Sequence, residues 1–382
     1  MPFNLKRNRQ KNQRWKNPSA KTNWLDWRQW QFDYWLLIVT AVMVGIGLII
    51  VYDASVIHAY RDFGEKYHYL KQQSIWVVLG SIALLVSSLF PYRNYKALAW
   101  PMFGMSLALI LAVFIPGLSV AGGGAHRWLD LGIITIQPAE IIKLTTIILL
   151  AMLFEKGARV QPFALIVGGV VMIIGVFQRD LGTAIVYFLS NLAVLVMAGV
   201  PLRLFWTLIP VGLAGFLMLV ASSTYRQRRI LAFLDPFSDP QGYTYHISQI
   251  LIALGTGSWF GLGLGQSRQK FEFIPEVTTD SIFAIVGEEF GFFGSIILIC
   301  LIAFLVYRGL SVAERCTDKF GKLLAFGLTA WLGTQAAINL ASMVSLIPLT
   351  GVPLPFISYG GSALLANMVA IGILLNISKS QK

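Results

Sequence analysis

The sequence predicts an all-α fold, that of a polytopic integral membrane protein with about ten transmembrane helices, on three observations. Apolar residues make up 56% of the 382 residues, and charged residues make up only 13%. A soluble surface needs about a quarter of its residues charged. The mean hydropathy is +0.68, and the chain repeats apolar runs that approach the roughly 20 helical residues needed to cross a bilayer. These observations exclude a soluble protein of several domains.

Ten apolar runs are expected to be the membrane-crossing helices, and together they define a membrane domain over residues 34–377. Residues 178–180 interrupt one long apolar stretch with charge, which favours a hairpin that turns there over one very long helix. The first run follows a long polar tail and lacks a small-residue cleavage site, so it is not expected to be a signal peptide. The expected spans lie at residues 34–52, 72–90, 97–115, 138–154, 162–178, 184–200, 203–221, 282–307, 323–347 and 357–377.

Lys and Arg near the ends of these runs predict that both termini are cytoplasmic. In this orientation nineteen basic residues lie in the tail and the cytoplasmic segments, against five in the short outer loops. The basic tail, residues 1–33, is expected to lie on anionic lipid, with docking to a cytoplasmic partner as the alternative. Residues 378–382 form a short cytoplasmic end, and the long loop 222–281 is extracytoplasmic.

The composition also narrows the possible ligands. A net charge of +12 would suggest nucleic acid in a soluble protein, but here it follows from membrane topology, so no nucleic-acid partner is expected. The two cysteines, Cys300 and Cys316, are too few for a disulfide framework or a thiolate metal site. The four histidines are dispersed and show no metal-ligand spacing.

The long outer loop has internal structure of its own. Ile247, Ile250, Leu251 and Leu254 follow the spacing of an amphipathic helix, which is expected to lie in the membrane interface. The glycines that follow, at 261, 263 and 265, resemble a nucleotide fingerprint only superficially, because no strand precedes them. A flexible turn is the expected structure there.

Charged side chains near the outer ends of the spans mark the candidate site. Asp280 stands at the start of the eighth span, where a carboxylate is favoured by the helix dipole even without a function. Glu288 and Glu289 lie about two turns deeper, where uncompensated charge is expensive, so one of them is expected to face a polar cavity or to pair with a cation. Glu140 and Lys143 share one face of the fourth span and are expected either to pair or to serve a substrate.

Backbone breakers lie between the last two spans. Non-helical backbone at this depth is tolerated only where it is buried in protein or lines a cavity. By themselves these features indicate a polar outer cavity, and they leave a transporter and a membrane enzyme open. The breakers are Pro348, Gly351, Pro353, Pro355, Gly360 and Gly361.

Four segments together resemble the SEDS family (shape, elongation, division and sporulation), which includes FtsW, RodA and SpoVE. The resemblance covers roughly residues 33–377, and the long tail and the Gly-Glu-Glu form favour the FtsW subgroup. Arg179 stands where the family usually has proline. The segments are RWL at 127–129 with IQPAE at 136–140 and Lys143, QRDLGTA at 178–184, PEVTTD at 275–280 with GEE at 287–289, and PLPFISYGGS at 353–362.

The resemblance implies a peptidoglycan glycosyltransferase that polymerises lipid II at the outer face of the bacterial cytoplasmic membrane. It implies work at the division septum with a class B penicillin-binding protein and other division proteins. Asp280 matches the family's essential aspartate, and an inverting transfer needs a base for the acceptor hydroxyl. No tightly bound cofactor is expected. The pyrophosphate leaving group needs either Arg and Lys or a divalent cation such as Mg or Mn.

The remaining site residues are expected to bind the substrate or to shape the cavity. A lipid II flippase, which would need a continuous polar path through the spans, and a division scaffold that recruits partners through the tail are the alternatives to the enzyme. Residues expected to contact lipid II and its pyrophosphate are Arg127, Lys143, Glu288 and Arg179. Residues expected to shape the cavity are Glu276, Glu140, Pro355, Ser358, Tyr359, Gly360 and Gly361.

Overall fold

The computed structural model describes residues 32–380 except 123, 124, 131, 133, 134, 202, 204 and 272. The predictions for the basic tail lie outside the described residues, apart from Phe32 and Asp33. Asp33 is the N-cap of the first helix and accepts a hydrogen bond from the backbone N–H of Leu36 at 3.1 Å.

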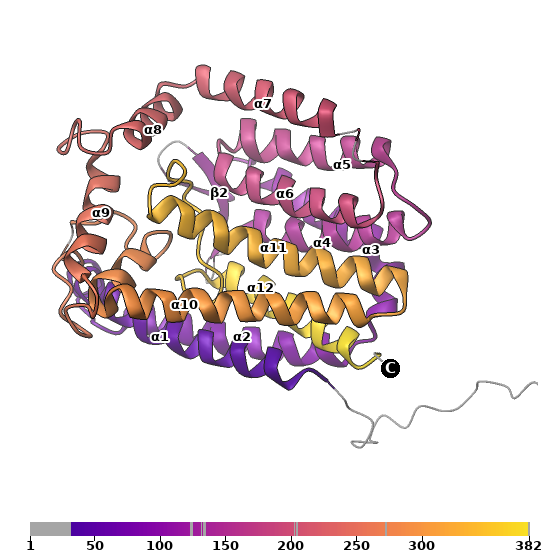
Figure 1. Cartoon of the computed structure of the whole chain (residues 1–382), viewed down its shortest axis with the longest axis horizontal. Helices are drawn as coiled ribbons and strands as arrows, with labels where there is room; N and C mark the ends of the chain where they lie inside the picture. The colour runs from indigo at the N-terminus through magenta and orange to yellow at the C-terminus, as the bar shows by residue number, and fades with distance from the viewer. Residues whose placement is uncertain are drawn as a thin grey trace, which may run out of the picture. The chain divides into compact units, whose positions relative to one another are not determined.

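Helices lie at each of the ten predicted spans, and Figure 1 shows the long ones running alongside one another. The predicted all-α polytopic fold is therefore confirmed. The α-helices are α1 (Tyr34–Phe63), α2 (His68–Leu89), α3 (Tyr95–Ala112), α4 (Pro138–Phe154), α5 (Val160–Met172), α6 (Leu181–Met197), α7 (Phe205–Ala221), α8 (Thr224–Leu234), α9 (Tyr245–Gly257), α10 (Ile282–Arg315), α11 (Lys319–Met343) and α12 (Gly361–Ser378). A short 3-10 helix, η2 (Tyr92–Asn94), precedes α3, and a π-helical turn, η3 (Ile173–Phe177), ends α5.

Among the described residues, seven helices are long and apolar enough to cross a membrane. The other three predicted spans, α4, α6 and α7, have 17 residues each, about 25 Å at 1.5 Å per residue. Most side chains of α4 are buried, whereas α2 and α3 bury fewer than half of theirs. The fourth span therefore lies inside the bundle, and the helices around it carry the lipid-facing surface.

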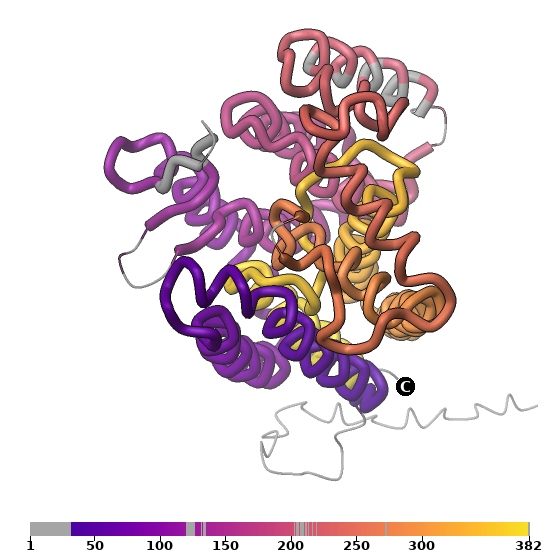
Figure 2. The backbone as a smooth tube through the Cα atoms, turned by 90° about the vertical axis from the view of Figure 1, so that its left-hand side faces the viewer, coloured from indigo at the N-terminus to yellow at the C-terminus, as the bar shows by residue number. Residues whose placement is uncertain are grey.

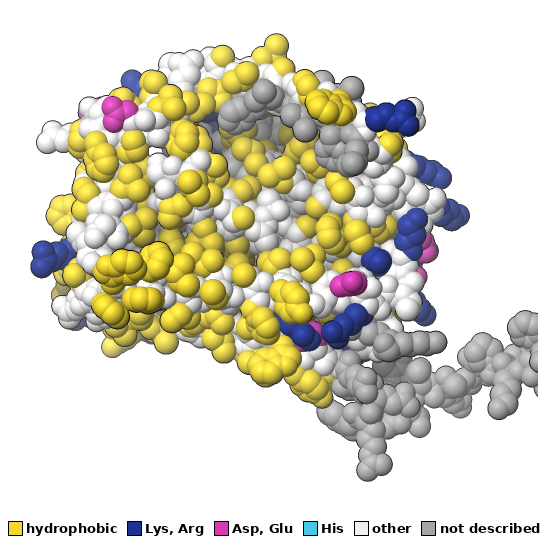
Figure 3. All heavy atoms as spheres, in the orientation of Figure 1, with side chains coloured by type: hydrophobic (Ala, Val, Ile, Leu, Met, Phe, Trp, Pro, Cys, Tyr) yellow, Lys and Arg dark blue, Asp and Glu magenta, His cyan; other side chains and the backbone are white. Residues whose placement is uncertain are grey.

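The two ends of the membrane domain lie on the same side. The backbone N–H of Asp33 donates to Ser378 Oγ at 3.1 Å, and Arg308 binds the Asp33 carboxylate through Nη2 at 2.5 Å. Figure 3 shows hydrophobic side chains across the flank of the molecule and most of the visible Lys and Arg toward the end where the chain terminates. This agrees with an even number of spans, and the cytoplasmic assignment of that side stays a prediction.

The opposite end, the outer end, carries more structure than the sequence predicted. Figure 2 looks onto this end, where the chain from α8 to the start of α10 runs along one side. The predicted amphipathic helix is present as α9, with Ile247 and Ile250 buried, and its place in the membrane interface stays a prediction. Helix α8 and a small antiparallel sheet were not predicted. The sheet has the order β1 (Ser119–Gly122), β2 (Ala125–Asp130) and β3 (Thr135–Ile136).

The glycines after α9 correct the expectation of a flexible turn. The backbone N–H groups of Leu262 and Gly263 donate to the carbonyls of Glu288 and Glu289, both at 3.0 Å. A Cβ on Gly261 would lie 2.1 Å from the carbonyl oxygen of Glu289, and α10 is kinked at Gly291, where φ is +65°. These glycines are needed because two backbones approach closely.

Candidate active site at the outer end

Asp280 lies at the end of the long outer loop, on a tight turn that starts at Glu276. The side chain of Asp280 is 8% exposed. The hydroxyl of Thr279 lies between two acids, 3.1 Å from Asp280 Oδ1 and 3.0 Å from Glu276 Oε2. Ser281 is the N-cap residue of α10 and caps with no side-chain hydrogen bond. The turn therefore presents two neighbouring carboxylates instead of using Asp280 as a simple helix cap.

Two other elements fix the position of Asp280. Asn339 of α11 donates from Nδ2 to the Asp280 carbonyl at 2.8 Å and to the Val352 carbonyl at 2.7 Å. The backbone N–H of Tyr359 donates to the Thr278 carbonyl at 2.8 Å. The aspartate is thereby held between α11 and the broken segment that precedes α12.

The surroundings of Asp280 raise its pKa to about 6. Burial is the main cause, and the charge of Glu276 adds to it, while Thr279 and the positive charge of Arg229 oppose the shift. At neutral pH most of this carboxylate is still ionised, yet it binds a proton more readily than an exposed aspartate does. Such a pKa suits a general base that works near neutral pH.

An arginine-rich cavity of about 370 Å³ is linked to this turn by two of its lining residues. The charge of Arg229 acts on Asp280, and Thr350 precedes Gly351, where a Cβ would lie 3.7 Å from Asp280 Oδ2. Its basic rim contains Arg127 of β2, Arg179 of the turn before α6, and Arg226 and Arg229 of α8, with Asp180 as the one acidic residue among the described lining residues. Burial and the charge of Arg179 lower the pKa of Arg226. Positive charge is thus in excess here. The apolar part of the lining includes Leu181, Ile185, Leu189, Val220, Ile230 and Ile338.

Arg127 and Arg179, two of the predicted substrate-binding residues, are brought together. Arg127 Nη2 donates to the Arg179 carbonyl at 2.8 Å, and Arg127 Nε lies 3.6 Å from Asp180 Oδ2. Asp180 also caps α6 by accepting from the N–H of Thr183 at 3.1 Å. Arg179 has φ +56°, which a proline ring cannot adopt. The replacement of the family's usual proline therefore accompanies a left-handed turn that exposes a cation.

Glu140 and Lys143 form an ion pair inside the bundle, each 1% exposed, with 2.7 Å between Nζ and Oε1. Lys143 also donates to Gln335 Oε1 at 2.7 Å, and its Nζ lies 5.2 Å from the centre of the Trp331 ring. Gln335 in turn donates to the Pro353 carbonyl at 3.1 Å. Lys143 was expected either to pair with Glu140 or to serve a substrate, and the structure shows the pairing. Through Gln335 the pair also contacts the backbone of the segment before α12.

Glu288 and Glu289 hold the segment before the turn. Glu288 accepts from the hydroxyl of Ser267 and from the N–H of Arg268 at 3.0 Å, and it is fully buried. Glu289 pairs with Lys270 at 3.1 Å, which is the cation that the sequence left unnamed. The geometry gives Glu288 structural partners, so contact of Glu288 with substrate stays a prediction.

The run 353–362, which leads into α12, is largely buried and contains five residues predicted to shape the cavity, Pro355, Ser358, Tyr359, Gly360 and Gly361. Their contact with a cavity stays a prediction. Ser358 Oγ accepts from the N–H of Leu354 at 2.8 Å, and the Tyr359 hydroxyl donates to Gln72 Oε1 at 2.5 Å. The N–H of Gly360 donates to Gln73 at 3.4 Å, and a Cβ on Gly361 would lie 2.0 Å from the Trp76 ring. Pro355 is buried in the same run. These contacts fix the segment against α2.

Several site residues were missed from the sequence. Arg226 and Arg229 lie in the long outer loop and were not selected, because α8 was not predicted. Gln335 and Asn339 are amides four residues apart on an apolar span, and that spacing on one helix face is a signal that could have found them.

The described residues do not fit a resident metal site. No group of three or more His, Cys, Asp or Glu in the described part of the chain could hold a metal ion. Asp180, the acid of the arginine-rich cavity, already binds Thr183 and faces Arg127. A divalent cation such as Mg or Mn at the pyrophosphate stays a prediction.

Fold and site together define a multi-pass helical membrane protein with a carboxylate beside a cationic cavity at one membrane face. Residues 34–382 match the family model for FtsW, RodA and SpoVE, described as cell cycle proteins. The chain belongs to this family, the SEDS family.

Sequence similarity to known proteins extends over nearly the whole chain. The chain is 36% identical to "Probable peptidoglycan glycosyltransferase FtsW" of Geobacter sp. (strain M18), over 91% of this chain and 96% of that protein. It is 37% identical to "Stage V sporulation protein E" of Bacillus subtilis (strain 168), over 91% and 97%.

Solved structures resemble it too. A chain from a peptidoglycan synthase complex that coordinates polymerization and crosslinking superposes with a TM-score of 0.73 at 28% identity, covering 91% of this chain and 98% of that chain. The rod shape determining protein RodA of Thermus thermophilus superposes with a TM-score of 0.67 at 27% identity, covering 92% and 98%.

Proposed function

We propose that this chain is a peptidoglycan glycosyltransferase that polymerises lipid II into β-1,4-linked glycan at the outer face of the cytoplasmic membrane. The observation that carries the proposal is the buried Asp280 carboxylate next to the arginine-rich cavity. A cationic rim over an apolar wall suits a lipid with an anionic head, and the aspartate suits deprotonation of a hydroxyl. Relatives named as peptidoglycan glycosyltransferases support the same reaction class.

The reaction is a single displacement at the anomeric carbon of the donor sugar. The acceptor 4-hydroxyl attacks C1, the new O4–C1 bond forms, and the bond from C1 to the undecaprenyl pyrophosphate oxygen breaks. Asp280 takes the hydroxyl proton as the oxygen attacks, which keeps the nucleophile from carrying a full positive charge. One inversion converts the α-linked donor into the β-linked product.

The arginines of the cavity stabilise the leaving group. Negative charge grows on the pyrophosphate as its bond to C1 breaks, and guanidinium groups bind phosphate oxygens in a bidentate manner. Arg127, Arg226 and Arg229 line the same cavity, so they are placed to act on one pyrophosphate. Fixed cations that meet charge developing in the transition state lower the barrier without reorganising solvent.

The cellular setting of this activity is a finer proposal. The similarity to FtsW proteins supports septal synthesis during cell division. A solved relative from a complex that joins polymerization and crosslinking supports a class B penicillin-binding protein as partner. Polymerisation next to a crosslinking enzyme would hand nascent glycan over without release.

The proposal is tested by measuring lipid II polymerisation with the purified protein. Its cognate penicillin-binding protein is present as a variant that cannot crosslink. Wild type and Asp280→Asn are compared at matched melting behaviour in detergent. Loss of a general base lowers rates by about 10²–10⁴-fold, and Asp280→Asn is expected to fall in that range. Equal glycan from both proteins would remove Asp280 as the base, and headgroup movement across vesicles without glycan would favour the flippase.

A further inference from the structure

A second, larger cavity lies on the other side of Arg229 from the arginine-rich cavity. Its volume is about 780 Å³, within the range of about 300–1,000 Å³ typical of small-molecule sites. Helices α8 and α9 and the loop at residues 345–349 form its walls. Both cavities share Tyr225, Arg229 and residues 347–349, and Arg229 donates to the Leu349 carbonyl at 3.0 Å across the shared wall.

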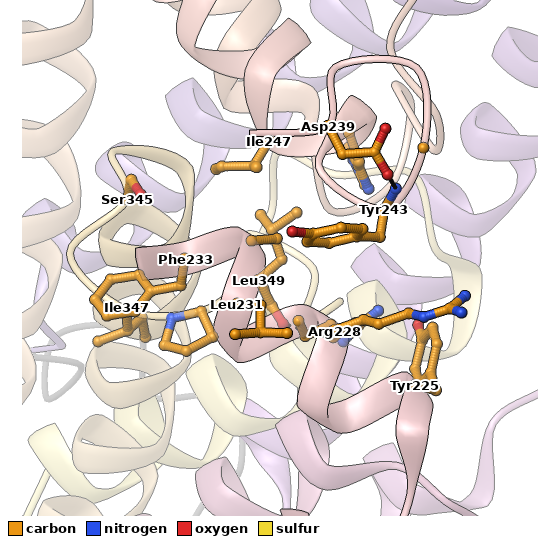
Figure 4. A pocket seen from close by; sticks show the side chains of 15 residues that line it. Tyr225, Arg228, Leu231, Phe233, Asp239, Tyr243, Ile247, Ser345, Ile347 and Leu349 are labelled. Atoms are coloured by element: carbon orange, nitrogen blue, oxygen red, sulfur yellow. Dashed lines mark hydrogen bonds between the residues drawn. The ribbon is translucent and has the colours of Figure 1, made fainter. Parts of the chain in front are cut away.

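The polar lining of this larger cavity is less cationic than that of the arginine-rich cavity. Two guanidinium groups, Arg228 and Arg229, accompany one carboxylate, whereas four accompany one in the arginine-rich cavity. Tyr243 and Arg228 project into it, with the Asp239 carboxylate next to the Tyr243 backbone (Figure 4). Arg228 is exposed. An aromatic ring with a mixed set of donors and acceptors suits a neutral polar ligand with an apolar face, such as a sugar ring, better than an anion.

His246 connects this cavity to the catalytic turn. Its ring lines the cavity, and its Nε2 lies 2.8 Å from Ser281 Oγ, one residue beyond Asp280. Burial and the charge of Arg229 lower the pKa of His246 to about 4, so the ring is neutral at neutral pH. The ring can therefore exchange a hydrogen bond with Ser281 without adding charge beside the base.

We propose that the larger cavity is the acceptor subsite, which takes the N-acetylated amino sugar whose 4-hydroxyl faces Asp280. The proposal rests on the polymerase function proposed above and assigns the two cavities to the two substrates. The arginine-rich cavity takes the pyrophosphate lipid of the donor, and the larger cavity takes the uncharged acceptor sugar. His246 is a positioning residue that holds the start of α10 through Ser281.

Two probes separate the two cavities on the full-length purified protein. Chitobiose, a β-1,4-linked dimer of N-acetylglucosamine, carries no phosphate and probes the acceptor subsite, and inorganic pyrophosphate probes the arginine-rich cavity. Binding is measured by ligand-observed NMR. Tyr243→Ala is expected to weaken chitobiose about 10-fold, equivalent to about 1.4 kcal/mol, and to leave pyrophosphate unchanged. Arg226→Ala is expected to do the reverse, and Arg315→Ala, an exposed site at the far end of α10, to change neither.

The role of His246 is tested by measuring kcat and KM separately in lipid II polymerisation. His246→Ala is expected to lower kcat about 10-fold, and His246→Gln, whose amide can still reach a hydroxyl, to restore most of it. A general loss of folding would lower both variants together, which melting curves detect.

Each result decides between the two proposals. Weak chitobiose binding in Tyr243→Ala with intact pyrophosphate binding supports the acceptor subsite. Absence of chitobiose binding to wild type at millimolar concentration, or its loss in Arg226→Ala alone, overturns it. Wild type that binds chitobiose as expected yet makes no glycan overturns the polymerase function and leaves the sugar site standing.

Discussion

Two pairs of acids lie on either side of the start of α10, Glu288 with Glu289 after it and Glu276 with Asp280 before it. The two pairs differ in the number of hydrogen-bond donors around them. Glu288 and Glu289 accept hydrogen bonds from backbone N–H groups, and Glu289 also pairs with Lys270. Glu276 and Asp280 share one threonine hydroxyl, and no cation lies in salt-bridge contact with either among the described residues. Both pairs contain a buried carboxylate, but only the first pair is saturated with donors.

This difference separates a structural pair, Glu288 and Glu289, from a pair that can take up a proton, Glu276 and Asp280. A carboxylate that accepts several backbone N–H groups anchors the segment that donates to it. A buried carboxylate with few donors and a like charge beside it keeps affinity for a proton, which is the property a base needs. The saturated pair fixes residues 265–270, and the turn with Asp280 follows within ten residues.

Removing the cation of the saturated pair is expected to give the largest effect on stability. Lys270 is buried and contacts both Asp53 and Glu289, at 2.8 and 3.1 Å. Lys270→Met leaves the buried Glu289 and the partly buried Asp53 without their cation, and breaking a buried pair in this way costs about 3–5 kcal/mol. Thermal unfolding in detergent, followed by intrinsic fluorescence, is expected to shift to lower temperature by a matching amount.

Lys71→Met is the matched control, because Lys71 pairs with Glu65 at an exposed position. Exposed pairs contribute about 0–1 kcal/mol, so this variant is expected to unfold like the wild type. Equal unfolding temperatures for Lys270→Met and wild type would show that the acids near α10 do not need the cation.

The sequence was sufficient for the spans and for the acids, but not for their surroundings. Composition and apolar runs located all ten helices, because lipid imposes length and hydropathy on each span independently. Asp280 could be selected from the loop motif. Its raised pKa could not be, because it depends on burial and on Glu276 and Arg229, which a turn and an unpredicted helix bring beside it.

The same limit applies to Glu288 and to Lys143. Both are charges at membrane depth, which rightly marks them as unusual. Whether such a charge meets substrate or a structural partner depends on contacts between distant segments, such as Lys143 with Gln335. Spacing within one helix showed the pair with Glu140 and nothing of the partner on α11.

Asn339 holds the backbone of Asp280, the buried member of the pair with few donors. Asn339→Leu removes the donor to the carbonyls of Asp280 and Val352 and leaves both buried carbonyls short of a partner. A buried group left unsatisfied costs about 1–3 kcal/mol. We expect stability to fall by that amount and the polymerisation rate per folded molecule to fall about 10-fold, since small displacements of a catalytic group are costly.

The control for this prediction is Asn339→Asp, which keeps the size of the side chain and exchanges its donor for an acceptor. It is expected to be at least as damaging as Asn339→Leu, because it places an acceptor against two carbonyl oxygens. An active Asn339→Asp protein would show that the amide does not position Asp280.

Glu276→Gln tests the smallest expected effect, the contribution of the second acid to the pKa of Asp280. Below about pH 6 Asp280 is protonated and cannot take the acceptor proton, so kcat/KM is expected to fall as the pH falls through this value. The glutamine removes a negative charge that favours protonation, so the pKa of Asp280 falls and the acid limb moves to lower pH. The movement is expected to be less than about one pH unit, because burial is the larger cause and remains. Glu314→Gln, at an exposed site near the other end of α10, is expected to leave the profile unchanged. A limb that stays in place in Glu276→Gln, or that moves to higher pH, would show that the group titrating near pH 6 is not Asp280.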